Sequence, residues 1–205
     1  MTSTRTLVRT VVRPATVADV PGIAEVVRAA YQEHVPELDA RHPGYLTDLL
    51  DVGSRLATGT VLVAEAGGTF TGTVTLHLDG SPAGSAGPQC SAVVRALAVD
   101  PAARSQGTAR ALMRSLIAYA MRGGADELCV RTPPFMTPAV ALFESLGFRP
   151  EPALGGPGTM LAYRLRLTGG RPATVRRLHR VNAQAPWPVR RHGDELLTPV
   201  WLAGR

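Results

Sequence analysis

The sequence predicts a mixed α/β (α+β) fold of one domain, and three observations support this prediction. Seven stretches with the pattern of strands alternate with four stretches that repeat apolar residues at helical spacing. A chain of 205 residues with 45% apolar and 19% charged residues can bury one substantial core. From residue 169 the periodicity fades, and Gly, Pro and Arg predominate. We therefore expect a domain over residues 5–168 and an Arg/Pro-rich extension over residues 169–205.

The N-terminal part of the chain predicts a strand followed by two helices. Residues 7–13 alternate apolar and polar side chains, and Pro14 ends this strand. Thr16 or Asp19 is suited to cap the first helix, and the second is expected at about residues 44–56. The apolar residues that share one helical face are Ile23, Val26, Val27 and Ala30 in the first helix and Leu46, Leu49 and Leu50 in the second.

The middle of the chain predicts a hairpin and a flexible loop. Residues 60–65 and 70–78 have strand patterns on either side of Gly67-Gly68. Residues 79–91 are rich in Gly, Ser, Ala and Pro, which is typical of a loop.

The C-terminal part of the domain predicts strands that alternate with two more helices. The helix after Pro101 ends at Gly123-Gly124, and the next one runs from Thr137-Pro138 to Gly147. The strands of this part are expected at residues 93–99, 128–131, 148–150 and 160–167.

The composition excludes several kinds of chemistry. All 22 basic residues are arginine, so the sequence lacks the lysine of a Walker phosphate loop, a Schiff-base enzyme or a pyridoxal enzyme. Neither HExxH nor GxSxG occurs, and we expect no metal site. No apolar run is long enough to span a membrane and no signal peptide is visible, so we expect a cytoplasmic protein with no membrane partner. Cys90 and Cys129 would then be reduced, with Cys129 in a buried strand.

The basic charge is concentrated in the extension. Residues 1–163 contain 13 Arg and 14 acidic residues, whereas residues 164–205 contain nine Arg and two acidic residues. Five of these arginines together with Trp187 would suit contacts with nucleic acid. Only one aromatic residue lies among them, so we favour a docked, partly solvated tail. The five arginines are Arg176, Arg177, Arg180, Arg190 and Arg191.

The segment from Asp100 to Arg110 predicts an anion-binding loop. It connects a strand to the N-terminus of a helix, where unpaired N–H groups and the helix dipole favour negative charge. Small residues at 107 and 109 let the backbone approach a ligand, and Arg104 and Arg110 supply positive charge. The loop suits a diphosphate, and an ordinary strand–helix connection is the alternative.

Three motifs of this chain resemble those of the GNAT acyltransferase superfamily. The family's pyrophosphate motif, R/Q-x-x-G-x-G/A, is matched by Arg104, Gly107 and Ala109. The opening Val12-Arg13-Pro14-Ala15-Thr16, followed by Asp19, is similar to the family's first strand and helix entry. The resemblance extends over about residues 8–167. The third motif is matched at Ala139, Leu142, Phe143, Glu144, Gly147 and Phe148.

The resemblance implies a GNAT domain over residues 5–168, with a central twisted mixed sheet of about seven strands that is splayed in the middle. Acetyl-CoA would be the co-substrate, with its pantetheine arm paired to the backbone of Leu97 and Val99. A primary amine of a small molecule or peptide would attack the thioester directly, with an N–H group near Leu97 stabilising the oxyanion. A homodimer is left open. The loop residues that would bind the pyrophosphate are Arg104, Ser105, Gln106, Gly107, Thr108, Ala109 and Arg110.

The chain departs from the family pattern where catalytic side chains are often found. Phe143 replaces a tyrosine, Met136 an asparagine, and Val93 stands at or near the position of a glutamate. His77 is the candidate base, and a structural strand histidine is the alternative. These departures also leave open a noncatalytic CoA-binding sensor or interaction module.

A run of acidic residues marks the expected acceptor side. These residues would attract a cationic amine, or they form a solvated helix face. They are Glu33, Glu37, Asp39, Asp48 and Asp51, against Arg41.

Overall fold

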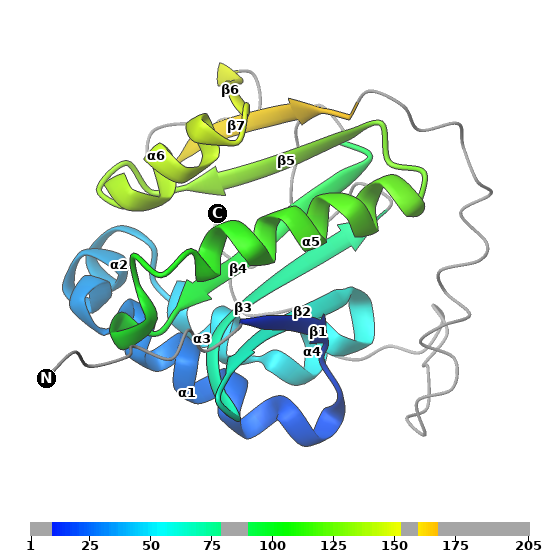
Figure 1. The fold of residues 1–205 in the computed structure, drawn as a ribbon. Coiled ribbons are helices and arrows are strands. Elements are labelled where there is room, and N and C mark those ends of the chain that lie inside the picture. The colour runs from blue at the N-terminus through cyan, green and yellow to red at the C-terminus, as the bar shows by residue number, and fades with distance from the viewer. Residues whose placement is uncertain (1–9, 79–89, 153–159, 168–205) are drawn as a thin grey trace, which may run out of the picture.

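One seven-stranded sheet organises the protein, as a computed structural model shows (Figure 1). The structure describes residues 10–78, 90–152 and 160–167. The sheet order is β1-β2-β3-β4-β5-β7-β6. The strands are β1 (Val11–Pro14), β2 (Thr60–Ala66), β3 (Thr69–Leu78), β4 (Ala92–Val99), β5 (Glu127–Thr132), β6 (Arg149–Pro150) and β7 (Leu161–Arg166).

The sheet is mixed, which confirms the predicted fold class. Neighbouring strands pair antiparallel except β4 and β5, which are parallel. A parallel pair needs a long crossover, which the segment containing α5 (Thr108–Arg122) provides. Part of the first predicted strand (residues 7–9), most of the predicted loop (79–89) and the extension (169–205) lie outside the described residues.

The described α-helices number six, where the sequence pattern predicted four. The predicted helix over residues 44–56 is two helices, because the backbone of Asp51 leaves the helical region and its carboxylate accepts the Ser54 N–H at 3.1 Å to cap the second. A short helix that begins around Pro36 also follows the first one. None of the described helices is long and apolar enough to cross a membrane. Besides α5, they are α1 (Val20–Tyr31), α2 (Val35–Arg41), α3 (Tyr45–Leu50), α4 (Val52–Thr58) and α6 (Thr137–Ser145), with short 3-10 turns η1 (Val17–Asp19), η2 (Gln32–His34) and η3 (Pro101–Ala103).

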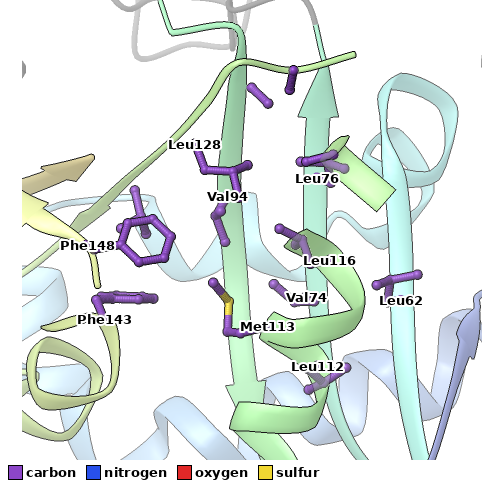
Figure 2. Packing of buried hydrophobic residues seen from close by; sticks show 14 of the residues in the cluster. Leu62, Val74, Leu76, Val94, Leu112, Met113, Leu116, Leu128, Phe143 and Phe148 are labelled. Atoms are coloured by element: carbon purple, nitrogen blue, oxygen red, sulfur yellow. The ribbon is translucent and has the colours of Figure 1, made fainter. Parts of the chain in front are cut away.

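Two hydrophobic clusters cover the two faces of the sheet. On one face, Leu112, Met113 and Leu116 of α5 pack over the strands, and α6 contributes Phe143 beside Phe148 (Figure 2). On the other face, α1 to α4 pack on alternate residues of the same strands, including Val61 and Val63. Helices therefore lie on both faces, and strands such as β2 place successive side chains into different clusters.

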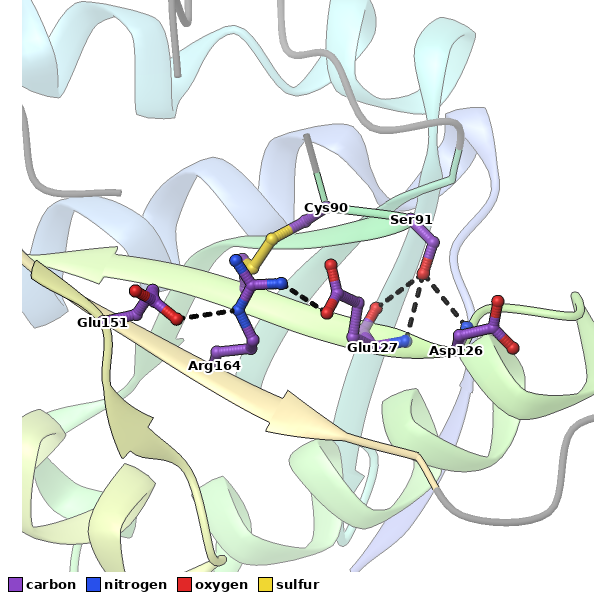
Figure 3. The surroundings of a disulfide bond; sticks show 7 residues. Cys90, Ser91, Asp126, Glu127, Glu151 and Arg164 are labelled. Atoms are coloured by element: carbon purple, nitrogen blue, oxygen red, sulfur yellow. Dashed lines mark hydrogen bonds and ion pairs between the residues drawn. A yellow bond between two sulfur atoms is a disulfide. The ribbon is translucent and has the colours of Figure 1, made fainter. Parts of the chain in front are cut away.

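Cys90 and Cys129 form a disulfide, so the expectation that both are reduced is wrong for this structure (Figure 3). Cys90 lies two residues before the start of β4, and Cys129 pairs with Val93 of that strand, so the parallel ladder brings the two together. Their Cα atoms are 6.1 Å apart, within the usual range for disulfides. Cys129 is a buried strand residue, as predicted.

A polar network surrounds the disulfide (Figure 3). The Ser91 hydroxyl accepts the N–H groups of Asp126 and Glu127 at 3.0 Å each and donates to the Glu127 carbonyl at 3.1 Å. Arg164 of β7 pairs with Glu127 and, at 3.2 Å, with Glu151. Covalent, polar and ladder contacts therefore all tie the start of β4 to β5 and its neighbours.

Candidate cofactor and acceptor site

The strands β4 and β5 separate after a short paired region. They pair only at Ala92–Leu128, Val93–Cys129 and Val94–Val130, although both strands continue beyond these positions and are described throughout. Figure 1 shows the two strands diverging towards their carboxyl ends. The backbone of β4 from residue 95 to 99 therefore has no partner on β5, and an unpaired strand edge can bind an extended ligand.

A bulge in β4 lies where the two strands separate. The register between β3 and β4 shifts between Thr73 and Thr75, and Ala96 has a φ of 52°. This φ is unusual for a residue other than glycine, and such strain concentrates at functional sites. The bulge also reverses the faces of the strand: Val94 packs in the α5 cluster, whereas Ala96 packs in the α1 cluster.

Tyr31 fixes the backbone next to this bulge. Tyr31 is the last residue of α1, and its hydroxyl donates to the Leu97 carbonyl at a distance of 3.1 Å. Tyr31 is buried, and burial raises the pKa of its hydroxyl well above the ordinary value. The hydroxyl is therefore a donor at neutral pH. Sequence reasoning missed this residue; the helical spacing from Ile23 and Val27 could have placed Tyr31 in the core, but not against Leu97.

The predicted anion-binding loop follows β4 at the same end of the sheet. Ser105 and Gly107 have φ values of 60° and 84°, so the chain turns sharply before α5 begins at Thr108. The first backbone bond across this junction runs from the Ala111 N–H to the Gly107 carbonyl at 2.9 Å. The N–H groups of the preceding turn therefore lack an acceptor within the helix. These donors lie at the positive end of the helix dipole.

Open space lies beside these donors. A Cβ atom added to Gly107 would meet no other heavy atom within 4 Å, and the side chains of Ser105 and Gln106 are exposed. The Gln106 amide donates back to the Ala102 carbonyl at 2.8 Å, which stabilises the turn. This geometry fits an anion such as a diphosphate.

The two arginines of the loop make different contacts. Arg104 pairs with Glu33 at 2.6 Å and donates to the Ala30 carbonyl at 3.1 Å, so it holds the loop to the end of α1. Arg110 donates to the Ser145 hydroxyl of α6 at 3.0 Å and has no carboxylate partner among the described residues. Arg110 therefore offers the charge that is more readily available to an anion.

The segment that contains the separated strands and the anion-binding loop matches a known protein family. The model of the acetyltransferase (GNAT) family matches residues 23–148, more than half of the chain. The chain belongs to this family. The matched region includes β4, the anion-binding loop, α5 and α6, which confirms the resemblance inferred from the motifs.

Solved structures of other GNAT proteins have the same fold. The ribosomal-protein-S18-alanine N-acetyltransferase of Escherichia coli is 18% identical, with a TM-score of 0.58 over 81% of this chain and 99% of its own. A GNAT acetyltransferase of Brucella melitensis in complex with acetyl-CoA is 17% identical, with a TM-score of 0.56 over 80% and 92%. The PaiA N-acetyltransferase of Thermoplasma acidophilum in complex with coenzyme A is 16% identical, with a TM-score of 0.59 over 78% and 99%. No curated protein sequence matches the chain.

The GNAT position that often holds a tyrosine is part of the core in this chain. Phe143 is buried, with ring centroids 5.6 Å from Phe148 and 6.4 Å from Tyr163. Met136, where the family often has asparagine, is also buried. Neither side chain can transfer a proton.

His77 lies on the face of the sheet that α1 to α4 cover. It is 9% exposed, and its Nε2 has no hydrogen-bond partner among the described residues. Burial lowers the pKa of its ring, and the charge of Arg95 lowers it further, so the ring is neutral at neutral pH. It pairs with Val93, four residues before Leu97 and so roughly 13 Å along β4. A role for His77 as the base stays a prediction.

The acidic side chains of the predicted acceptor side are partly neutralised. Asp48 pairs with Arg95 at 2.5 Å, and Glu33 pairs with Arg104. Arg55 is buried near Asp48, donating to the Thr75 hydroxyl at 2.9 Å and to the Leu49 carbonyl at 2.6 Å. The arginines Arg55, Arg95 and Arg104 therefore offset the negative charge next to the separated strands, and the sequence of residues 33–51 does not contain them.

Proposed function

We propose that this chain transfers an acetyl group from acetyl-CoA to a primary amine, through direct attack of the amine on the thioester. The observation that carries the proposal is the junction of two features: β4 leaves β5 after Val94, and the anion-binding loop follows the free end of β4. The described residues of the predicted domain, residues 5–168, contain both features. Binding of acetyl-CoA or coenzyme A by GNAT proteins of the same fold supports the choice of donor.

The loop and β4 have separate roles in this proposal. The N–H groups from Ser105 to Arg110, together with Arg104 and Arg110, hold the pyrophosphate. The free backbone of β4 at Leu97 and Val99 pairs with the pantetheine arm. Both interactions involve the backbone, so they need an open loop and an unpaired strand edge more than particular side chains.

The chemistry needs little acid–base assistance on the leaving-group side. The neutral amine nitrogen bonds to the acyl carbon and gives up a proton to water, and the carbon–sulfur bond breaks to release a thiolate. A thiol with a pKa of about 8.5 is a far better leaving group than an amine, so an acid at position 143 is not required. An N–H group near Leu97 stabilises the oxyanion, and the Tyr31 hydroxyl keeps the neighbouring backbone in place.

Substitution of Gly107 tests the proposed donor site. Wild-type protein should bind acetyl-CoA with a Kd of about 1 μM or tighter, or roughly −8 kcal/mol, by calorimetry. Gly107→Glu should abolish binding, because a carboxylate would enter the space in front of the N–H groups. Gly68→Glu is a matched control, since Gly68 also has a φ of 80° and open space but lies in the β2–β3 turn. Absence of binding by the wild type would contradict the proposed function.

A noncatalytic CoA-binding sensor is the second candidate function. The observation in its favour is the burial of Phe143 and Met136, which leaves two family positions without polar side chains. Release of CoA during incubation with a panel of amines separates the candidates, since a sensor binds acetyl-CoA without amine-dependent turnover.

A further inference from the structure

Two arginines stand at the point where β4 and β5 separate. Val94 and Val130 are the last paired residues of the two strands, and Arg95 and Arg131 follow them directly. Both valines belong to the α5 cluster. Because side chains alternate along a strand, both arginines are directed towards the face that α1 to α4 cover. We refer to Arg95 and Arg131 as the arginine pair.

The positive charges of both arginines affect the ionisation of the Tyr45 hydroxyl. Burial raises the pKa of the Tyr45 hydroxyl, and Arg95 and Arg131 both act against this rise. Burial also lowers the pKa of His42, and Arg131 is among the charges that lower it further. The rings of His42 and Tyr45 have centroids 6.1 Å apart. Arg131 therefore lies close enough to both rings to affect them, and Arg95 close enough to affect Tyr45, at the start of α3.

The local carboxylates do not balance this positive charge. Asp48 pairs with Arg95, whose side chain is still 33% exposed. Arg131 is exposed and makes no ion pair with any described residue. Arg55 adds a third positive charge near Asp48 and Asp51, so three arginines stand against two carboxylates. The Nε2 atom of His42 is buried without a hydrogen-bond partner among the described residues, so a polar group next to the pair is unsatisfied.

We propose that the arginine pair binds an anionic group, a carboxylate or a phosphate, of the acceptor amine. The inference rests on the proposed acetyl transfer and narrows its acceptor to amines that carry a nearby negative charge. Arg95 precedes Leu97 by two residues, or roughly 7 Å along a strand, and its long side chain can hold an anion near an amine that attacks close to Leu97. The planar guanidinium of Arg131 can form two parallel hydrogen bonds with either anion.

The inference reverses the charge expected of the acceptor. The acidic run over residues 33–51 suggested an affinity for cations, but Asp48 and Glu33 are held by arginines in the structure. A polyamine has no group that would pair with Arg131. An α-amino acid or a phosphorylated amine does.

The test compares acceptors that differ only in the anionic group. kcat and KM are measured at saturating acetyl-CoA for the common amino acids, for the corresponding amino acid amides, and for phosphoethanolamine against ethanolamine. We expect KM to be about tenfold or more lower for the anionic member of the accepted pairs. The kind of pair that the protein accepts, amino acid or phosphoethanolamine, distinguishes a carboxylate from a phosphate.

Variants assign this preference to the arginine pair. Arg131→Gln should raise KM for the anionic acceptor about tenfold and leave both KM for the neutral acceptor and the Kd of acetyl-CoA unchanged. Arg149→Gln removes an exposed arginine from β6 at the edge of the sheet and should change none of these values. Binding of N-acetyl amino acids and their amides to CoA-bound protein, measured by calorimetry, gives a readout that does not depend on turnover.

Several outcomes would overturn the inference. One is a KM for the neutral acceptors that is equal to or lower than that for the anionic ones. Another is an equal effect of Arg131→Gln on KM for both members of a pair. The third is a protein that binds acetyl-CoA but neither turns over any acceptor nor binds the acidic products. Failure of the wild type to bind acetyl-CoA is a separate result, because it would overturn the proposed function itself.

Discussion

Tyr31 shows how one side chain connects an acceptor-side helix to the strand that carries the proposed thioester site. Its hydroxyl donates to Leu97, one residue after the strained backbone of Ala96. A hydrogen bond at this point restricts the rotation of the peptide that follows Leu97, and backbone groups of this region would face the reacting carbonyl. Tyr31 is therefore a positioning residue in the proposed reaction.

Tyr31→Phe should slow catalysis more than it weakens cofactor binding. The variant keeps the ring in the core but leaves the Leu97 carbonyl without its donor, at a cost of about 1–1.5 kcal/mol. If this cost falls on the transition state, kcat decreases about tenfold, and the Kd of acetyl-CoA changes less than threefold. Tyr119→Phe on α5 is the control. Reduced thermal stability with an unchanged kcat would show that the hydroxyl has only a structural role.

The residues that the sequence could predict are those whose roles depend on local chain geometry. The loop from Arg104 to Arg110 was predictable, because a strand, small residues and a helix start follow each other directly along the chain. The bond from Tyr31 to Leu97 joins residues 66 positions apart, and it exists only because α1 packs across β3 and β4. The arginine pair likewise depends on the register of a parallel ladder, which no short motif specifies.

At the scale of elements, Asp19 organises the connection from β1 to α1. Its carboxylate accepts two bonds from Arg13 at 2.8 and 2.9 Å and one from the Thr16 N–H at 2.7 Å. Thr16 and Asp19 form a capping box around η1, so the prediction that one of them begins the helical segment is confirmed. Arg13 also pairs with Glu65 of β2, which fixes the first strand to the sheet.

Asp19→Asn should destabilise the protein at neutral pH and less so in acid. The hydrogen bonds from Arg13 hold the pKa of Asp19 well below its usual range, although burial opposes this shift. The ionised carboxylate therefore stabilises the fold at pH values above the unfolded pKa of about 3.9, and this stabilisation is lost as the pH falls towards the folded pKa. We expect a loss of about 1–3 kcal/mol in urea unfolding at pH 7. The unfolding free energies of the wild type and the variant should converge below about pH 3. A difference in unfolding free energy that is constant with pH would contradict this origin.

Helix boundaries on the acceptor side were harder to predict than those of the cofactor side. The apolar spacing over residues 44–56 continues across Asp51, so the pattern alone indicates one helix. The break arises because the Asp51 carboxylate competes for backbone N–H groups and begins a new helix at Val52. By contrast, Gly123 follows the last residue of α5 as predicted.

At the scale of the whole molecule, the disulfide closes a loop that contains most of the proposed cofactor site. Cys90 and Cys129 are separated by 39 positions, between which lie β4, the anion-binding loop and α5. Cross-linking such a loop stabilises a protein mainly by restricting its unfolded state. The two cysteines are distant from each other in sequence and form no CxxC pair, so only the parallel pairing of β4 with β5 makes the bond predictable.

Replacement of both cysteines by serine should lower the unfolding free energy by about 3–4 kcal/mol. Wild-type protein treated with a thiol reductant should lose a similar amount, and the variant should not respond to the reductant. Acetyl-CoA binding should persist at temperatures where the variant is folded, because the disulfide joins the start of β4 to β5, whereas the anion-binding loop follows the other end of β4. Two free thiols in the purified, air-exposed wild type, with no response to reductant, would contradict the prediction.

The separation of β4 from β5 has a geometric consequence for ligand size. From the last pair at Val94 to the end of β4 the arm is five residues, or roughly 17 Å. A change of about 5° in the direction of this arm relative to β5 moves its tip by about 1.5 Å, close to one carbon–carbon bond along an acyl chain. The disulfide ties together the paired region that precedes the vertex of this angle, and the bond from Arg110 to Ser145 joins α5 to α6. In the proposed reaction, the width of the space for the acyl chain would thus depend on the angle at which the two parts of the sheet meet.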